Sequence, residues 1–235
     1  MSHDPDDPAA RARRLAAESL AGGDATGWFD QLYIDAEHGR TDVPWDRGEA
    51  NPILAGWFAA DGRRGNGATA LVIGSGLGDD AELVASRGFR TSAFDISPTA
   101  VRAAQARHPG SPVDYHVANL LTPPPEWAGG FDLVVESMTV QSLPRSLRAQ
   151  ATAGVRGFVA DGGTLVVIAF ARTDEHAEDS GPPWPLTRDE VEAFASDSLR
   201  TGAIDMVLRE DGTEFWRAWF DGHGGAEPGA TNPDS

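Results

Sequence analysis

The chain has 235 residues, 40% of them apolar, which is enough to build the core of one domain. Asp and Glu outnumber Lys and Arg by 36 to 19, and the net charge of −17 argues against a nucleic-acid partner, whose phosphates would be repelled. The chain contains no Cys, which excludes disulfides, a thiolate nucleophile and Cys-ligated metals.

The two ends differ in composition from the rest. Residues 1–8 are polar, and residues 221–235 are rich in Gly, Pro and acids, so we expect disordered tails around a single domain at 9–220. No apolar run approaches the roughly 20 residues that span a bilayer, and the N-terminus lacks the features of a signal peptide. We therefore expect a soluble, cytoplasmic protein with no membrane partner, either a monomer or a homodimer.

The first predicted element is a helix at 9–21, which a pair of glycines ends. A loop with a high density of aromatic and acidic residues, from Trp28 to Asp46, is expected next. The apolar run at 70–73 predicts a strand, and a helical pattern begins at Asp79 after a Gly-rich turn.

Strands and helices alternate in the remainder of the chain. Further strands are expected at 89–95, 113–117, 131–136, 165–170, 203–209 and 214–220, and further helices at 99–107, 146–160 and, after the capping box that starts at Thr187, through Phe194. This alternation predicts an α/β, doubly wound, mostly parallel seven-stranded sheet that helices cover on both faces.

The turn from Gly74 to Gly78 joins a strand to a helix, where a ligand can approach the backbone and meet free N–H groups. A dinucleotide fingerprint that starts at Gly74 would need its third glycine at position 79, where Asp79 would instead face a pyrophosphate. S-adenosylmethionine (SAM) has no phosphate and carries a positive sulfonium. The spacing and the charge therefore favour SAM over NAD as the cofactor.

Polar residues also follow the next strands at the same edge of the sheet. Asp95 ends the second strand, where its carboxylate can bind the ribose hydroxyls of an adenosine or cap a turn. Asn119 and Leu120 follow the third strand, where an adenine ring would lie, although Asn119 can equally cap a loop. Glu136 and Ser137 end the fourth strand and are expected to face the same crevice. Glu136 is a candidate catalytic base or sulfonium partner, or else a strand-end acid with a structural role.

Metal and serine-hydrolase chemistry find no support in the sequence. The six histidines show no metal-binding spacing, so we predict no metal, and no Gly-x-Ser-x-Gly motif is present.

The stretches LVIGSGLG, FDIS and FDLVVES, within 70–170, resemble the class I SAM-dependent methyltransferases. Three further stretches are similar to the thiopurine S-methyltransferase and halide/thiol methyltransferase group: GWFDQLY with VPWDRGEANPIL (27–54), GPPWPLTRDEV (181–191) and FWRAWF (215–220). The resemblance implies a Rossmann-like methyltransferase domain that uses SAM and releases S-adenosylhomocysteine. It also implies that an N-terminal helical segment, residues 9–60, folds over the cofactor.

The Gly-rich turn and the resemblance together give a set of expected cofactor-binding residues. These are Trp28, Trp45, Gly74, Gly76, Asp95, Asn119, Leu120 and Ser137. Indole rings beside a sulfonium would supply cation–π attraction, unless the two tryptophans are ordinary core residues.

The chain departs from the pattern of the group at three positions. Leu32 stands where related enzymes often have Trp, Asn119 replaces the commoner Asp, and Ser137 replaces a bulkier Tyr or Arg. These changes suggest a wider pocket than a halide needs.

Methyl transfer from a sulfonium is an in-line displacement, in which alignment of the reactants in a dry pocket matters most. A thiol ionises appreciably near neutral pH, whereas an alcohol needs a strong base, and the sequence shows no positioned His–Asp pair. We therefore expect S-methylation of a small thiol. The alternatives are O- or N-methylation of a small metabolite, a SAM-binding protein without transfer activity, and an NAD-linked oxidoreductase, which Asp79 disfavours.

Overall fold

The computed structural model of the chain describes residues 7–172 and 181–223. Most of the two tails expected at 1–8 and 221–235 lies outside the described residues. None of the helices in the described ranges combines the length and the hydropathy that crossing a membrane requires.

Seven strands form one sheet in the order β3-β2-β1-β4-β5-β7-β6. The first five pair in parallel, and β7 pairs antiparallel with both β5 and β6. The prediction of a mostly parallel seven-stranded sheet is therefore confirmed. The strands are β1 (Thr69–Ile73), β2 (Arg90–Asp95), β3 (Asp114–Val117), β4 (Phe131–Ser137), β5 (Val159–Phe170), β6 (Leu199–Leu208) and β7 (Glu214–Gly222).

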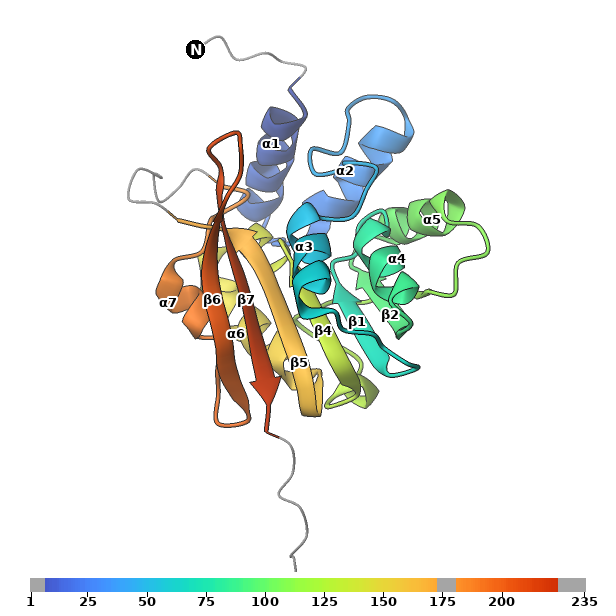
Figure 1. Cartoon of the computed structure of the whole chain (residues 1–235). Helices are drawn as coiled ribbons and strands as arrows, with labels where there is room; N and C mark the ends of the chain where they lie inside the picture. The colour runs from blue at the N-terminus through green and yellow to red at the C-terminus, as the bar shows by residue number, and fades with distance from the viewer. Residues whose placement is uncertain (1–6, 173–180, 224–235) are drawn as a thin grey trace, which may run out of the picture.

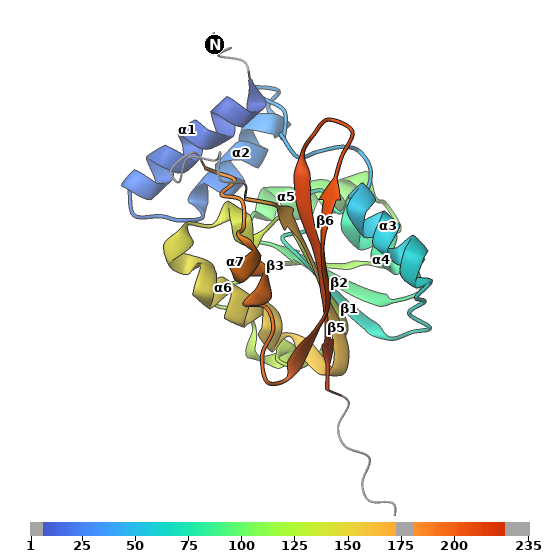
Figure 2. The same ribbon diagram turned by 60° about the vertical axis from the view of Figure 1, so that its left-hand side comes forward.

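Helices cover both faces of the sheet, and α1 and α2 lie above the edge at which the parallel strands end (Figures 1 and 2). The helices are α1 (Pro8–Ala21), α2 (Gly27–Glu37), α3 (Pro52–Asp61), α4 (Asp79–Ser86), α5 (Pro98–Arg107), α6 (Arg145–Gly157) and α7 (Arg188–Glu192), with short 3-10 turns η1 (Pro125–Trp127) and η2 (Val140–Ser142).

The buried central strands carry apolar side chains on both faces, as expected of parallel strands that helices cover on each side. In β1, Leu71 and Ile73 pack into the apolar layer that contains α6 and α7. Ala70 and Val72 point the other way, into the layer that contains α3, α4 and α5. The Gly-rich turn after β1 therefore starts from a rigid, fully packed strand.

The expectation of a loop from Trp28 to Asp46 is wrong in its first part, because residues 27–37 form α2. Trp28, Leu32, Tyr33 and Asp35 are buried. Trp28, Leu32 and Asp35 are spaced i, i+4 and i+7 on one helical stripe, whereas Tyr33 packs separately with Val43 and Ala100. The density of aromatic residues is thus the buried face of a helix.

Helix α3 is a second element that the sequence analysis did not predict. The Asn51 side chain accepts a hydrogen bond from the Ile53 N–H (3.0 Å), Pro52 occupies the first helical position, and Gly62 ends the helix with φ 71°. The buried residues of α3 belong to the sheet packing. The last part of the expected covering segment, 9–60, therefore lies against a face of the sheet (Figure 2).

The domain extends slightly beyond the expected bounds of 9–220. Helix α1 begins at Pro8, because the Asp7 carboxylate accepts the first free N–H groups of the helix. Strand β7 reaches Gly222, which pairs with Leu199 of β6.

Helices α1 and α2 are joined by a buried carboxylate. Asp35 is 2% exposed, and its two oxygens accept hydrogen bonds from Arg11, Gln31 and Arg40. Burial alone would raise the pKa of Asp35, but the hydrogen bonds from Arg11 and Arg40 outweigh it and lower the pKa to about 2. The ionised carboxylate therefore stabilises the docking of α1 against α2.

We expect Asp35→Asn to weaken the docking of α1 by about 1–3 kcal/mol, because two charge-assisted contacts are lost. Native-state hydrogen exchange of the α1 amides measures the change. In the native protein the contribution is present above the ordinary pKa of 3.8 and is lost as the pH falls toward 2. Asp42→Asn, at an exposed position, is the matched control. Equal α1 protection in the two variants would contradict this role of Asp35.

Candidate functional site

A cavity of about 400 Å³ lies at the edge of the sheet where the parallel strands end. This volume is within the usual range for small-molecule sites. The structure brings together at this cavity all eight residues expected to bind a cofactor. They are Trp28, Trp45, Gly74, Gly76, Asp95, Asn119, Leu120 and Ser137.

The Gly-rich turn forms one wall of the cavity. Gly74 and Gly76 have φ of 58° and 52°, in the left-handed region that favours glycine. A Cβ on Gly74 would lie 2.3 Å from the Thr139 Oγ1, and one on Gly76 would lie 2.9 Å from the Tyr33 hydroxyl oxygen. The absence of these Cβ atoms lets Thr139, from the turn after β4, and Tyr33, from α2, reach the Gly-rich turn.

Asp95 lies behind this turn and is 7% exposed. One carboxylate oxygen accepts the Gly76 N–H and the other accepts the Ser97 N–H, each at 2.9 Å. Burial raises the pKa of Asp95, against the effect of these hydrogen bonds. A carboxylate accepts about four hydrogen bonds, so Asp95 retains acceptor sites toward the cavity.

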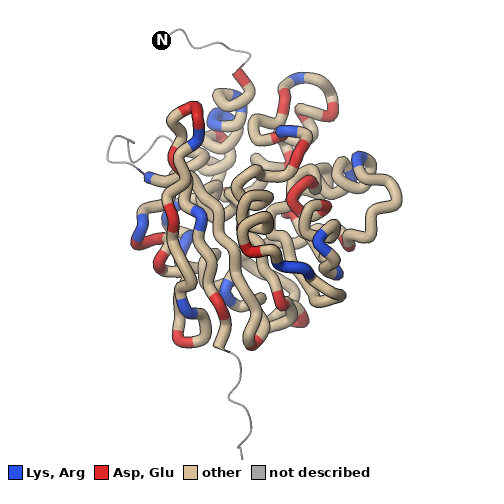
Figure 3. Tube along the Cα trace, viewed as in Figure 1, with Lys and Arg blue, Asp and Glu red and all other residues tan. Residues whose placement is uncertain are grey.

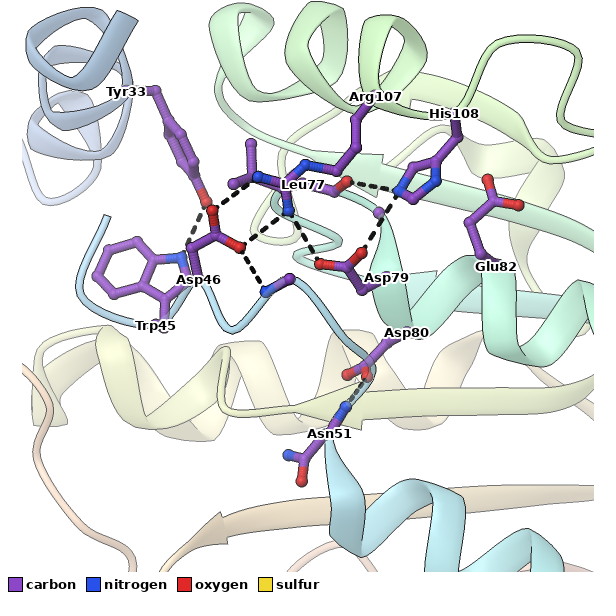
Figure 4. Close-up of polar contacts among 12 residues, drawn as sticks. Tyr33, Trp45, Asp46, Asn51, Leu77, Asp79, Asp80, Glu82, Arg107 and His108 are labelled. Atoms are coloured by element: carbon purple, nitrogen blue, oxygen red, sulfur yellow. Dashed lines mark hydrogen bonds and ion pairs between the residues drawn. The ribbon is translucent and has the colours of Figure 1, made fainter. Parts of the chain in front are cut away.

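Aromatic side chains from the N-terminal segment cover the turn (Figure 4). The Trp45 Nε1–H donates to the Tyr33 hydroxyl (3.0 Å), and the Trp28 ring meets the Trp45 ring edge to face at 6.2 Å. Leu32 is fully buried with Trp28 and does not belong to the cavity lining. The missing Trp at position 32 therefore does not by itself widen the cavity.

Arg107 fastens the loop after α2 to the two helices that follow the Gly-rich turn (Figure 4). Its guanidinium lies 2.7 Å from Asp46 on the loop and 3.1 Å from Asp79 at the start of α4. Hydrogen bonds to Asp46 raise the pKa of Arg107, and the same contact lowers the pKa of Asp46. Figure 3 shows the acidic residues of this loop and of the first turn of α4 in red. Asp79 thus pairs with an arginine as well as lining the cavity.

A second contact joins α2 to α5. The Asp30 carboxylate accepts the Ser97 Oγ–H (2.6 Å) and the Thr99 N–H (3.1 Å) at the start of α5. Burial alone would raise the pKa of Asp30, but these hydrogen bonds lower it overall. The Asp30 carboxylate therefore attaches the start of α2 to the start of α5.

The sequence analysis missed a polar cluster beside the Gly-rich turn. Asp80, in the first turn of α4, accepts the Asn51 N–H (2.6 Å), and the Asn51 Nδ2–H donates to the Ser137 Oγ (3.2 Å). Burial raises the pKa of Asp80. All three residues line the cavity. The available signal was the position of Asp80, two residues after Gly78 at a helix N-terminus.

Asn119 and Leu120 stand where the sequence placed them, after β3. The Asn119 Oδ1 accepts the Leu121 N–H (2.8 Å), so this side chain caps the loop while it lines the cavity. Leu120 is buried and belongs to both the apolar core and the cavity wall.

The expectation that Glu136 faces the crevice is wrong. Glu136 is fully buried and does not belong to the cavity lining. Its Oε1 accepts the N–H groups of Thr139 and Val140, each at 2.8 Å, whereas Oε2 has no hydrogen-bond partner. Successive residues of a strand point to opposite faces, so the neighbour Ser137 reaches the cavity and Glu136 does not. Burial raises the pKa of Glu136 to about 7.

We expect Glu136→Gln to stabilise the protein at pH 8 and to leave its stability nearly unchanged at pH 5. The raised pKa means that the native protein loses stability as the pH rises from 4.5 through about 7. The neutral amide avoids this loss, which amounts to about 3 kcal/mol. Urea unfolding at the two pH values measures it, with Glu37→Gln at an exposed position as the control. The same change in stability at both pH values would refute the assignment.

Comparisons with known proteins identify a family and a fold that this chain resembles. A family model for thiopurine S-methyltransferase matches residues 35–211. A relative named "Probable thiol methyltransferase 2", from Arabidopsis thaliana, is 29% identical over 181 residues, which cover 76% of this chain and 74% of the relative.

Two solved structures have a similar fold. One comes from work on the conversion of a disulfide bond into a thioacetal group during echinomycin biosynthesis, with a TM-score of 0.67, 18% identity, and coverage of 84% of this chain and 94% of that one. The other is the 1,6-didemethyltoxoflavin-N1-methyltransferase of Burkholderia thailandensis with bound S-adenosylhomocysteine, with a TM-score of 0.63, 17% identity, and coverage of 95% and 93%.

Proposed function

This chain belongs to the thiopurine S-methyltransferase family, and on that basis we propose that it methylates the sulfur of a small thiol. It is a SAM-dependent methyltransferase of small molecules. The observation that supports the proposal is the cavity at the carboxyl edge of the sheet. The Gly-rich turn forms one wall of this cavity, and Trp28 and Trp45 from the N-terminal segment form another.

The residues at the cavity fit SAM. The Gly-rich turn offers close backbone approach, Asp95 retains acceptor sites for ribose hydroxyls, and Leu120 supplies an apolar surface for adenine. Trp28 and Trp45 would lie over the cofactor. We assign the eight lining residues predicted from the sequence to this role.

The charges at the cavity favour a cationic ligand. Asp80 and Asp95 both line the cavity, and burial raises the pKa of each. A positive charge beside these carboxyl groups would favour their ionised forms and so gain binding energy. When bound, SAM supplies a methyl group on a positive sulfonium. Its product is less positive by one charge, so the acidic wall holds the donor more strongly than the product.

The acceptor determines what the protein must do for the reaction. The sulfur lone pair of the acceptor forms the new carbon–sulfur bond, and the electron pair of the broken bond stays on the departing sulfur. A thiol loses its proton to water near neutral pH, so the cavity needs only to align the reactants and exclude solvent. Glu136 does not belong to the cavity lining, so it is not placed to serve as the base that an alcohol acceptor would need.

We expect S-adenosylhomocysteine to bind the protein with micromolar or tighter affinity, and Asp95→Ala to weaken binding about 100-fold because two charge-assisted hydrogen bonds are lost. Isothermal titration calorimetry measures both. Asp114→Ala, at an exposed strand end, is the matched control. Tight binding of NADH in place of S-adenosylhomocysteine would show that the proposed cofactor is wrong.

We expect the protein to methylate benzenethiol at least 100-fold faster than phenol or aniline, because the thiol ionises readily to a strong nucleophile, whereas phenol needs a base and neutral aniline is a weaker nucleophile. The three acceptors differ only in the attacking atom, and mass spectrometry of the methylated product compares them directly. Rapid turnover of phenol or aniline with no thiol product would establish O- or N-methylation instead. SAM binding without product from any acceptor would indicate a protein that binds the cofactor without transferring its methyl group.

A further inference from the structure

The turn that follows β4 contributes a buried amide to the cavity. Gln141 lies in η2, is 1% exposed and lines the cavity with its neighbours Met138 and Thr139. Thr139 closes over Gly74, since a Cβ there would lie 2.3 Å from the Thr139 Oγ1. The turn therefore stands next to the Gly-rich cradle.

The orientation of the Gln141 amide is fixed. Its Oε1 accepts the N–H of Phe170, the last residue of β5, at 2.6 Å. A backbone N–H can only donate, so the oxygen must face Phe170 and the NH₂ group must face the other way. The Gln141 carbonyl also accepts the Trp184 N–H (2.8 Å), which holds the Pro182–Pro183 wall of the cavity to the same residue.

The NH₂ group of Gln141 is poorly satisfied. Its partner is the thioether sulfur of Met138 at 3.6 Å, and a thioether is a weak acceptor. Met138 is only partly buried and has φ 68°, an unusual conformation for a residue other than glycine. A flexible methionine side chain can turn aside and leave both amide donors to a ligand.

The neighbouring hydroxyl donors are already used inside the protein. The Thr139 Oγ1–H donates to the Ile73 carbonyl at 3.0 Å, and the Ser142 Oγ–H donates to the Met138 carbonyl at 2.9 Å. Among the described residues of this turn, Gln141 is thus the side chain with donors to spare for a ligand.

We propose that the Gln141 amide donates a hydrogen bond to the attacking sulfur and so binds the acceptor as a thiolate. This inference rests on the proposed function, since it concerns the acceptor of the same site. A thiolate is a stronger acceptor than a thioether, so exchanging the Met138 contact for the ligand strengthens the hydrogen bond. The thiol proton passes to solvent before transfer, and no protein base takes part.

Ile73, Phe170 and Trp184 contact the turn from β1, β5 and the Pro182–Pro183 wall and are neutral, and the carboxyl of Glu136 accepts hydrogen bonds from its backbone. Arg148 of α6 donates a hydrogen bond to the Trp184 carbonyl. The charged residues of the cavity lining are Arg13, Asp46, Arg47, Glu49, Asp79, Asp80 and Asp95. Glu136 titrates near pH 7, so its ionisation must be separated from that of the ligand. Measurements in the Glu136→Gln background serve this purpose.

The test compares two ligands of the protein saturated with S-adenosylhomocysteine. Benzenethiol can present a thiolate, whereas thioanisole, its methylated product, presents a thioether that is larger by one methyl group. We expect benzenethiol to bind at least 10-fold more tightly at pH 8, and its ultraviolet spectrum to show the bound thiolate with a pKa below that of the free thiol. If the native protein bound the two ligands equally and left the thiol pKa unshifted, the proposal would be overturned without any variant.

Gln141→Met removes the donors at similar side-chain length, and we expect it to reduce the preference for benzenethiol about 10-fold or more. Binding of S-adenosylhomocysteine should change less than threefold, which distinguishes loss of the donor from loss of the fold. Gln150→Met is the matched control, because the Gln150 amide donates to the Leu121 carbonyl on the exposed side of α6. An unchanged preference in Gln141→Met would refute the assignment.

The two proposals fail in different ways. A protein that methylates benzenethiol but does not favour the thiolate would retain its function and lose this role of Gln141. A protein that methylates only phenol or aniline would lose the proposed function, and the thiolate contact with it.

Discussion

The close approach of side chains to the turn after β1 is the constraint on which the rest of the site depends. Gly74 and Gly76 adopt left-handed conformations, and the absence of their Cβ atoms lets Thr139 and Tyr33 close on the turn from two directions. One comes from the end of β4 and the other from α2. A Cβ atom at either position would collide with these side chains. The two glycines therefore allow the buried strand to end directly at the ligand cavity.

The sequence predicted the elements whose patterns are local and strong. Parallel strands such as β1 and β4 are predominantly apolar runs, which are typical of buried strands. Helix α5 begins at Pro98, and the Ser97 Oγ before it accepts the Ala100 N–H, which is a common cap at a helix start. Helix α2 was not predicted, because its many aromatic and acidic residues suggested a loop. Trp28, Leu32 and Asp35 nevertheless have helical spacing and are buried. Helix α3 has cap signals at Asn51 and Gly62, but its composition is predominantly apolar and shows no amphipathic pattern that would predict a helix.

The residues of the candidate site likewise fall into those with a local sequence signal and those without one. Residues that follow a strand or belong to the Gly-rich turn could be placed in advance, because parallel topology gathers strand ends at one edge. The contacts of Arg107 and the cluster at Asp80 join segments far apart in the chain. The position of Asp80 after the Gly-rich turn was a signal for that residue, but one sequence does not show which distant residue it pairs with. The prediction for Glu136 was wrong because neighbouring residues of a strand point to opposite faces of the sheet. The sequence does not show which face each one takes, and the structure places Ser137 at the cavity and Glu136 in the interior.

The family match begins at residue 35, so α1 and most of α2 precede it. These two helices nevertheless supply Arg13, Trp28 and Phe29 to the cavity wall. They are attached to the sheet domain by few polar contacts, chiefly those of Asp30. Part of the cavity wall therefore comes from helices that precede the matched segment. A change in α1 or α2 would alter the shape of the cavity while the sheet and the Gly-rich turn keep their sequence.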